Sequence, residues 1–207
     1  SYGDGTQSEP YNCDIVERRQ IDAVSIALYE KVKVEGQTRV SVLLRKGIRA
    51  PVYLRKDLDD KQRPEPLYTK IYELVAGVLE DGDLGYEGVD HRAVEEAREE
   101  VGLEIGREAV GSLGASFFPS PGITPEKVYL AACEGKIEVR GEALGDGSVM
   151  EEGATAEILD LREAIAMCRT GEIQDAKTEI GLLRLADYLG YIPQLDCFME
   201  DLPEELR

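Results

Sequence analysis

The chain contains 207 residues, of which 43% are hydrophobic, and it carries a formal net charge of −18. This length suits one sizeable domain, or one domain with an appended sheet. Because nucleic-acid sites are basic, the acidity disfavours DNA and RNA as partners. No apolar run approaches the roughly 18 residues of a membrane span, and the first residues lack the basic start and apolar core of a signal peptide. Four cysteines without paired spacing disfavour zinc and a disulfide framework, so we expect a cytoplasmic protein with reduced thiols.

The elements expected in the first half of the chain are mostly strands. Residues 1–20 are polar and are expected to form an arm. Two apolar, β-branched runs flank Glu35-Gly36-Gln37, which indicates a hairpin. The expected strands of this half are 22–32, 38–45, 51–55 and 70–76, and a charged, proline-bearing loop is expected over 57–66.

The second half is expected to combine helices with further strands. Asp90 is the expected N-cap of a helix that Gly102 ends, as a glycine after the last turn commonly does. The expected helices are 90–101, 161–169 and 175–189, and the expected strands are 108–118, 126–134 and 155–160. Strands and helices do not alternate regularly. A mixed sheet between helical layers is therefore predicted rather than a doubly wound parallel sheet.

Three glutamates gather in the last turns of the helix expected over 90–101. Glu96, Glu99 and Glu100 stand at positions i, i+3 and i+4, which are neighbours on one helix face. Their carboxylates repel one another unless a cation lies between them, and Mg²⁺ prefers such oxygen ligands together with substrate phosphates.

The alternative is a merely solvated, glutamate-rich helix face, which is the commoner case. Glu96 and Glu100, however, border the apolar stripe of the same helix, and Gly102 fixes them in its last turns. The stripe comprises Ala93, Val94, Ala97 and Val101. A metallo-phosphate site is therefore favoured.

The box-like segment, residues 77–103, resembles the Nudix box, G-x5-E-x7-R-E-U-x-E-E-x-G-U, where U is aliphatic. The matching residues are Gly77, Glu96, Glu99, Glu100, Gly102 and Leu103. The departures are Asp83 at the first glutamate, four additional residues between Asp83 and Glu95, Glu95 in place of the arginine, and Ala97 at the aliphatic position. Arg92 precedes Glu96 by one helical turn, so it is better placed than Arg98 to replace the missing arginine.

Outside residues 77–103, several short segments resemble corresponding segments of Nudix hydrolases that cleave ADP-ribose and nucleotide sugars. They are residues 44–46, 49–51, 72–77, 118–122, 126–130, 151–153 and 171–178. The resemblance implies an α/β/α sandwich with a mixed β-sheet and an extra N-terminal antiparallel sheet. The implied organisation is a polar arm 1–20, a sheet region 21–56 that can pair with a second subunit, a catalytic domain 57–195 and an acidic tail 196–207.

The resemblance also implies roles for individual residues. The implied metal ligands are Glu96, Glu99, Glu100 and the main-chain carbonyl of Ala76, holding Mg²⁺ or, as a substitute, Mn²⁺. The implied catalytic carboxylates are Glu152, then Glu151, and Glu99 within the helix, and the implied substrate-binding residues are Arg45, Arg49 and Glu73. Two alternatives are equally open: Glu151 and Glu152 form only a charged turn, and Arg45 and Arg49 form only surface ion pairs.

Three functions follow as hypotheses. The first is metal-dependent hydrolysis of a nucleoside diphosphate linked to another group, such as ADP-ribose or a nucleotide sugar, by a homodimer. The second is hydrolysis of nucleoside triphosphates, against which the lead-in 72–77 speaks. The third is a degenerate Nudix fold that binds a nucleotide or partner without chemistry, which Glu95 and the lengthened segment keep open.

Overall fold

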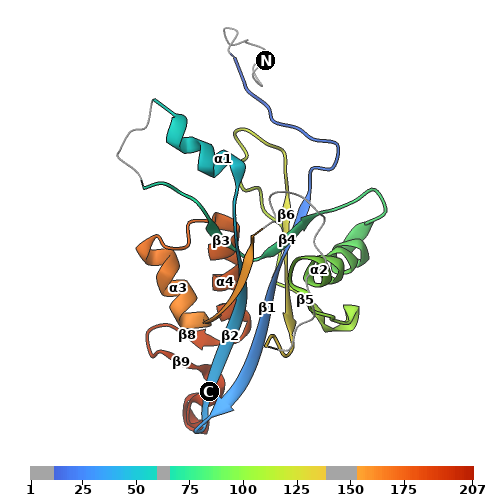
Figure 1. The fold of residues 1–207 in the computed structure, drawn as a ribbon. Helices are drawn as coiled ribbons and strands as arrows, with labels where there is room; N and C mark the ends of the chain where they lie inside the picture. Colours follow the sequence, from blue (N-terminus) through green and yellow to red (C-terminus); the bar gives the residue numbers. More distant parts are fainter. Residues whose placement is uncertain (1–11, 60–65, 139–152) are drawn as a thin grey trace, which may run out of the picture.

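The computed structural model describes residues 12–59, 66–138 and 153–207. Over these ranges a mixed seven-stranded sheet carries helix α2 (Gly85–Val101) on one face and helices α3 (Leu161–Thr170) and α4 (Ala176–Tyr188) on the other (Figure 1). The predicted mixed sheet between helical layers is confirmed at this level. No helix in the described ranges is long and apolar enough to cross a membrane.

A long hairpin forms the middle of the sheet. Its strands are β1 (Ala23–Val34) and β2 (Gln37–Gly47), which pair antiparallel as the sequence predicts. The turn residues Glu35 and Gly36 both have positive φ, 52° and 83°. Two such residues in succession are what a type I′ hairpin turn requires, and its twist matches that of the flanking strands.

The hairpin strands separate at one end, and two further strands lie between them there. Over residues 23–26, β1 pairs with β4 (Val75–Val78), and only from Leu28 onward does it pair with β2. Strand β3 (Ile71–Glu73) pairs instead with the end of β2. The other strands are β6 (Val128–Glu134), parallel to β1, β5 (Val110–Ser112), antiparallel to β6, and β7 (Thr155–Asp160), antiparallel to β2.

The separate N-terminal sheet implied by the resemblance is not formed. Strand β1 lies between β6 and its partners β4 and β2, so the hairpin belongs to the main sheet. The reason is that side chains on both faces of β1 are apolar and buried, and a free sheet would expose one of these faces. The small extra sheet lies instead near the C-terminus, where β8 (Tyr191–Ile192) pairs with β9 (Cys197–Phe198).

Two hydrophobic clusters attach the helices to the two faces of the sheet. Alternation along β1 directs Ile26 and Leu28 toward α2, and Ala27 and Tyr29 toward α3 and α4. The α2 side is completed by Val89, Ala93, Ala97 and Val101, and the opposite side by Leu161, Ala164, Leu182 and Leu185. Of the apolar stripe predicted for α2, Ala93, Ala97 and Val101 are therefore buried, and Val94 is half-buried.

Three expected elements differ from the structure. Residues 51–55 are not a strand: Pro51 begins a short helix, α1 (Ala50–Tyr53), followed by the 3₁₀ turn Leu54–Asp57, because proline suits the first helical turn. Strand 108–118 is reduced to β5 after a 3₁₀ turn, Arg107–Ala109. Helix α2 begins at Gly85 rather than after Asp90, and Leu84 at its N-cap makes no side-chain capping bond.

The C-terminal tail folds back onto the hairpin. Thr38, which is buried, donates its N–H to Asp201 Oδ2 at 2.9 Å and its hydroxyl to Glu200 Oε1 at 2.7 Å. Lys33 pairs with the same two carboxylates. Burial opposes ionisation of Asp201, but the bonds from Lys33 and Thr38 outweigh it and lower the pKa of Asp201 to about 2.

Candidate functional site

The C-terminal half of α2 lies directly against strand β4. The Ala76 N–H donates to Glu100 Oε2 at 3.2 Å, and the Glu96 carboxylate lies against Gly77. A Cβ atom at Gly77 would stand 1.7 Å from Glu96 Oε1, so a side chain there would displace the glutamate. Two of the three clustered glutamates, Glu96 and Glu100, are thereby held beside successive residues of one strand.

Arg45 joins this cluster from strand β2. It is 4% exposed, and its Nε lies 3.4 Å from Glu100 Oε1. In the pairing of β2 with β3, Arg45 stands opposite Glu73, which is equally buried. A surface ion pair, the alternative reading of Arg45, is thus excluded. Losing one partner of a buried pair leaves an uncompensated charge, so Arg45 and Glu100 also fix α2 against the sheet.

Glu73 is shared by two cations. Arg49 Nε donates to Glu73 Oε2 at 2.6 Å, and Lys177 Nζ lies 3.7 Å from Glu73 Oε1. Burial disfavours the charged Arg49, but the carboxylates of Glu73, Glu100 and Asp175 outweigh it and raise the pKa of Arg49. The Arg49 and Lys177 side chains are 36% and 26% exposed, so a ligand can also reach them.

A second ion-pair group lies at the other end of the box-like segment. Arg92 Nε donates to Asp83 Oδ2 at 2.8 Å, and Arg92 Nη1 lies 3.9 Å from Glu96 Oε1. Burial opposes the charge of Asp83, but bonds from the Glu80 N–H, Arg92 and His91 lower the pKa of Asp83. Arg92 therefore connects Asp83 to Glu96, in the place that the sequence predicts for the substitute cation.

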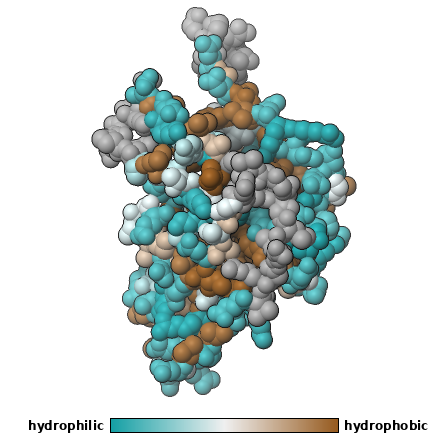
Figure 2. Space-filling view, in the orientation of Figure 1, coloured by the Kyte–Doolittle hydropathy of each residue, from teal (hydrophilic) through white to brown (hydrophobic). Residues whose placement is uncertain are grey.

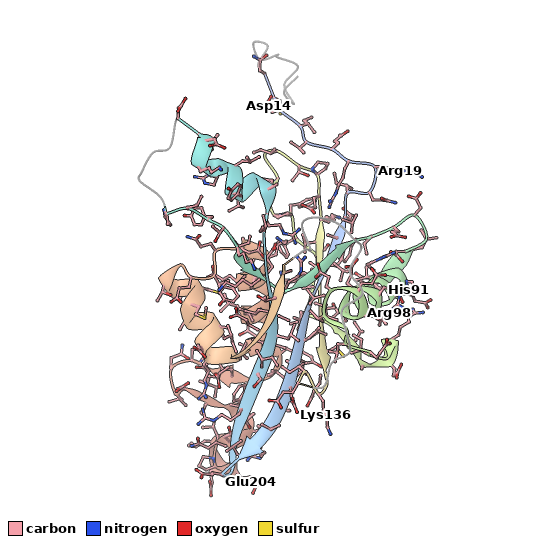
Figure 3. The ribbon with its side chains drawn as sticks, viewed as in Figure 1. Asp14, Arg19, His91, Arg98, Lys136 and Glu204 are labelled. Atoms are coloured by element: carbon pink, nitrogen blue, oxygen red, sulfur yellow. The ribbon has the colours of Figure 1, made fainter. Side chains whose placement is uncertain are left out.

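Glu99 stands apart from the cluster. It is about one-third exposed and lies 3.7 Å from Arg98, which also pairs with Glu95 at 2.6 Å. Figure 3 labels Arg98 and His91 on α2, and the edge of the molecule along this helix is mostly hydrophilic in Figure 2. The contacts thus bring together six predicted site residues, Arg45, Arg49, Glu73, Ala76, Glu96 and Glu100, and leave Glu99 outside. Glu151 and Glu152 lie outside the described residues.

The described carboxylates fit a divalent cation only in part. Among described residues, no group of three or more histidine, cysteine or carboxylate side chains is arranged to hold a metal ion. Glu96 and Glu100, one helical turn apart against β4, nevertheless supply the hard oxygen donors that Mg²⁺ prefers, and Mg²⁺ usually completes its shell with water and phosphate oxygens. A cation there would compete with Arg45 for Glu100.

Sequence reasoning did not assign a site role to the first turn of α4. Asp175 caps this helix by accepting the Thr178 N–H at 2.9 Å, and its carboxylate also pairs with Lys177 at 2.6 Å. An aspartate three residues before a threonine at a helix start is a recognisable capping signal. The proximity of this turn to Glu73, which Lys177 contacts from about a hundred residues later in the chain, has no local signal in the sequence.

Comparison of the sequence with models of known protein families finds no match, and comparison with curated proteins finds none either. Function is therefore argued from the described geometry and from the residue pattern alone.

Proposed function

We propose that this protein is a divalent-metal-dependent hydrolase of the Nudix type. Its substrate is a nucleoside diphosphate linked to another group, such as ADP-ribose or a nucleotide sugar, and its products are a nucleoside monophosphate and a sugar phosphate. The observation that carries the proposal is the convergence of Glu96 and Glu100 on strand β4, beside the cations Arg45 and Arg49. Carboxylates for a cation and arginines for phosphate are the two components that pyrophosphate chemistry needs.

Metal binding, phosphate binding and proton transfer are proposed for different residues. Mg²⁺, if bound at the site, would supply neutralisation of phosphate charge and a lowered pKa for its water. Glu96 and Glu100 would hold the cation, and the exposed part of Arg49 would orient the phosphates by paired hydrogen bonds. Water adds to one phosphorus, the bond from that phosphorus to the bridging oxygen breaks, and the water loses a proton to a carboxylate. Glu152, with Glu151 second, is proposed for that proton transfer.

The test is a phosphate-coupled assay over ADP-ribose, nucleotide sugars, dinucleoside polyphosphates and nucleoside triphosphates, with Mg²⁺, Mn²⁺ or excess chelator. Turnover of the linked diphosphates that stops in chelator supports the proposal, and preference for triphosphates supports the second hypothesis. Glu100→Gln should abolish most turnover, whereas Glu95→Gln serves as a control because Glu95 pairs with Arg98. Equal turnover in chelator would falsify the proposal.

One observation favours binding without chemistry. Glu100 is already paired by Arg45 and the Ala76 N–H, so its charge is compensated without a metal ion. A protein that binds nucleotides without hydrolysing them would keep this arrangement when nucleotide is added. Titration with Mn²⁺, followed by electron paramagnetic resonance in the presence and absence of ADP-ribose, separates the two cases. Nucleotide binding without metal binding or turnover supports the binding protein.

A further inference from the structure

The chain changes its pairing partner at Leu74. Strand β3 pairs with β2 up to Glu73, and β4 pairs with β1 from Val75, so Leu74 belongs to neither ladder. Leu74 is 2% exposed, and leaving a buried N–H without a partner is destabilising. This N–H donates to Thr178 Oγ1 at 2.9 Å.

Thr178 is itself held rigidly at the start of α4. It is fully buried, and its hydroxyl donates to Asp175 Oδ2 at 2.7 Å. One helical turn later, a Cβ atom at Gly181 would stand 2.4 Å from Leu74 Cδ1, so the helix and Leu74 are in close contact there as well. Both the main chain and the side chain of Leu74 therefore contact α4.

The residues next to Leu74 carry the contacts of the candidate site. Glu73 immediately precedes it and binds Arg49, and Ala76 follows two residues later and binds Glu100. A shift of the main chain at Leu74 would move both contacts. Lys177, adjacent to Thr178, also reaches Glu73, which adds a second connection between α4 and the same segment.

We propose that Thr178 is a positioning residue for the candidate site. Its hydroxyl fixes residues 73–76, so that Glu100 and Arg49 keep the relative geometry required to hold a pyrophosphate for attack by water. The inference rests on the proposed hydrolase function. A misplacement of about 1 Å can lower a rate by about 10²-fold without changing the groups that bind substrate. The expected signature is therefore a loss of kcat with little change in KM.

The competing explanation is that Thr178 only stabilises the fold. The chain offers a matched control, because Thr38 is also a buried threonine with a bonded hydroxyl. Thr38 contacts the C-terminal tail through Glu200 and Asp201 and, within the described part of the chain, bonds none of the site residues named above. Replacing it should lower stability without affecting the site.

The experiment compares Thr178→Val, Thr178→Ser and Thr38→Val with the wild type. kcat and KM are measured on the best linked diphosphate with Mg²⁺, at a temperature where circular dichroism shows each variant folded. We expect Thr178→Val to lower kcat by about 10–100-fold with KM within about 3-fold, Thr178→Ser to restore most of it, and Thr38→Val to keep the wild-type kcat. Thr178→Ala, with the same expectation, replaces the valine variant if that does not fold.

Two results would overturn the inference while leaving the hydrolase proposal intact. One is a Thr178→Val enzyme with wild-type kcat and a lowered unfolding temperature. The other is a Thr38→Val enzyme that loses as much kcat as Thr178→Val. A wild-type protein that turns over no linked diphosphate would instead overturn the proposed function, and the positioning role with it.

Discussion

Replacing Arg92 with alanine should damage both stability and the candidate site. Arg92 is largely buried and bonds Asp83 at 2.8 Å, so Arg92→Ala leaves a buried carboxylate without its cation. Loss of one partner of a buried pair costs about 3–5 kcal/mol. Solvent access through Glu80 and His91, which are exposed, weakens this coupling, so we expect the free energy of unfolding to fall by about 2–3 kcal/mol.

The same substitution should lower turnover, because Arg92 also lies 3.9 Å from Glu96. The matched control is Arg98→Ala, since Arg98 is a half-buried arginine of the same helix that pairs with Glu95. The assays are urea unfolding and kcat/KM on the best linked diphosphate, at equal Mg²⁺ and below the unfolding transition. We expect a loss of about tenfold or more for Arg92→Ala and little change for Arg98→Ala. The reverse order of activities would refute the assignment of Arg92 as the substitute cation.

Two further predictions test the packing of the site and of the tail. Gly77→Ala should reduce turnover by at least about tenfold, because the new methyl group would displace Glu96. The control is Gly82→Ala, which should be neutral because a Cβ at Gly82 meets nothing within 4 Å. Equal kcat/KM for the two variants would contradict this reasoning. Since the folded pKa of Asp201 is about 2 against 3.8 ordinarily, its ionised form stabilises the fold above about pH 4, and that contribution is lost as the pH falls toward 2. Asp201→Asn should therefore lower the free energy of unfolding by about 1 kcal/mol at pH 7, allowing for screening at half-exposed Lys33, and by almost nothing near pH 2. The measurement is urea unfolding at both pH values. The same loss of stability at both would argue against the lowered pKa of Asp201.

Elements specified by local pattern were predictable from the sequence. The hairpin follows from two apolar runs around a turn, and α3 and α4 begin at aspartates whose side chains accept a helix N–H, Asp160 and Asp175. Residues 51–55 were misread because Val52 and Tyr53 favour strands. No neighbouring strand pairs with them in the described structure, and the proline suits a helix start instead.

The site could be predicted only in part, because its contacts join distant segments. Glu96 and Glu100 lie against β4 as their spacing on one helix face indicates, whereas Glu99, predicted to join them, lies apart. That Glu100 meets Arg45, and that Thr178 supports Leu74, depends on β3 and β4 entering the gap between β1 and β2. No periodicity within a strand or helix encodes such an insertion. The expectation that the N-terminal hairpin forms a separate sheet was wrong for the same reason.

The lengthened box-like segment is consistent with a displaced but intact acid–arginine pair. Asp83 precedes α2, and its main chain lies against Gly88 of that helix, so the four residues added after Asp83 do not separate it from Arg92. Relative to the pattern that the chain resembles, the arginine moves from the position of Glu95 to Arg92, which is three residues nearer the helix start. Asp83 and Arg92 therefore still meet, at 2.8 Å, and Arg92 still approaches Glu96 across one turn. The added residues lie between β4 and Glu96, yet Glu96 and Glu100 both contact β4. The departures from the pattern thus leave the ion pairs of Arg92 with Asp83 and Glu96 in place.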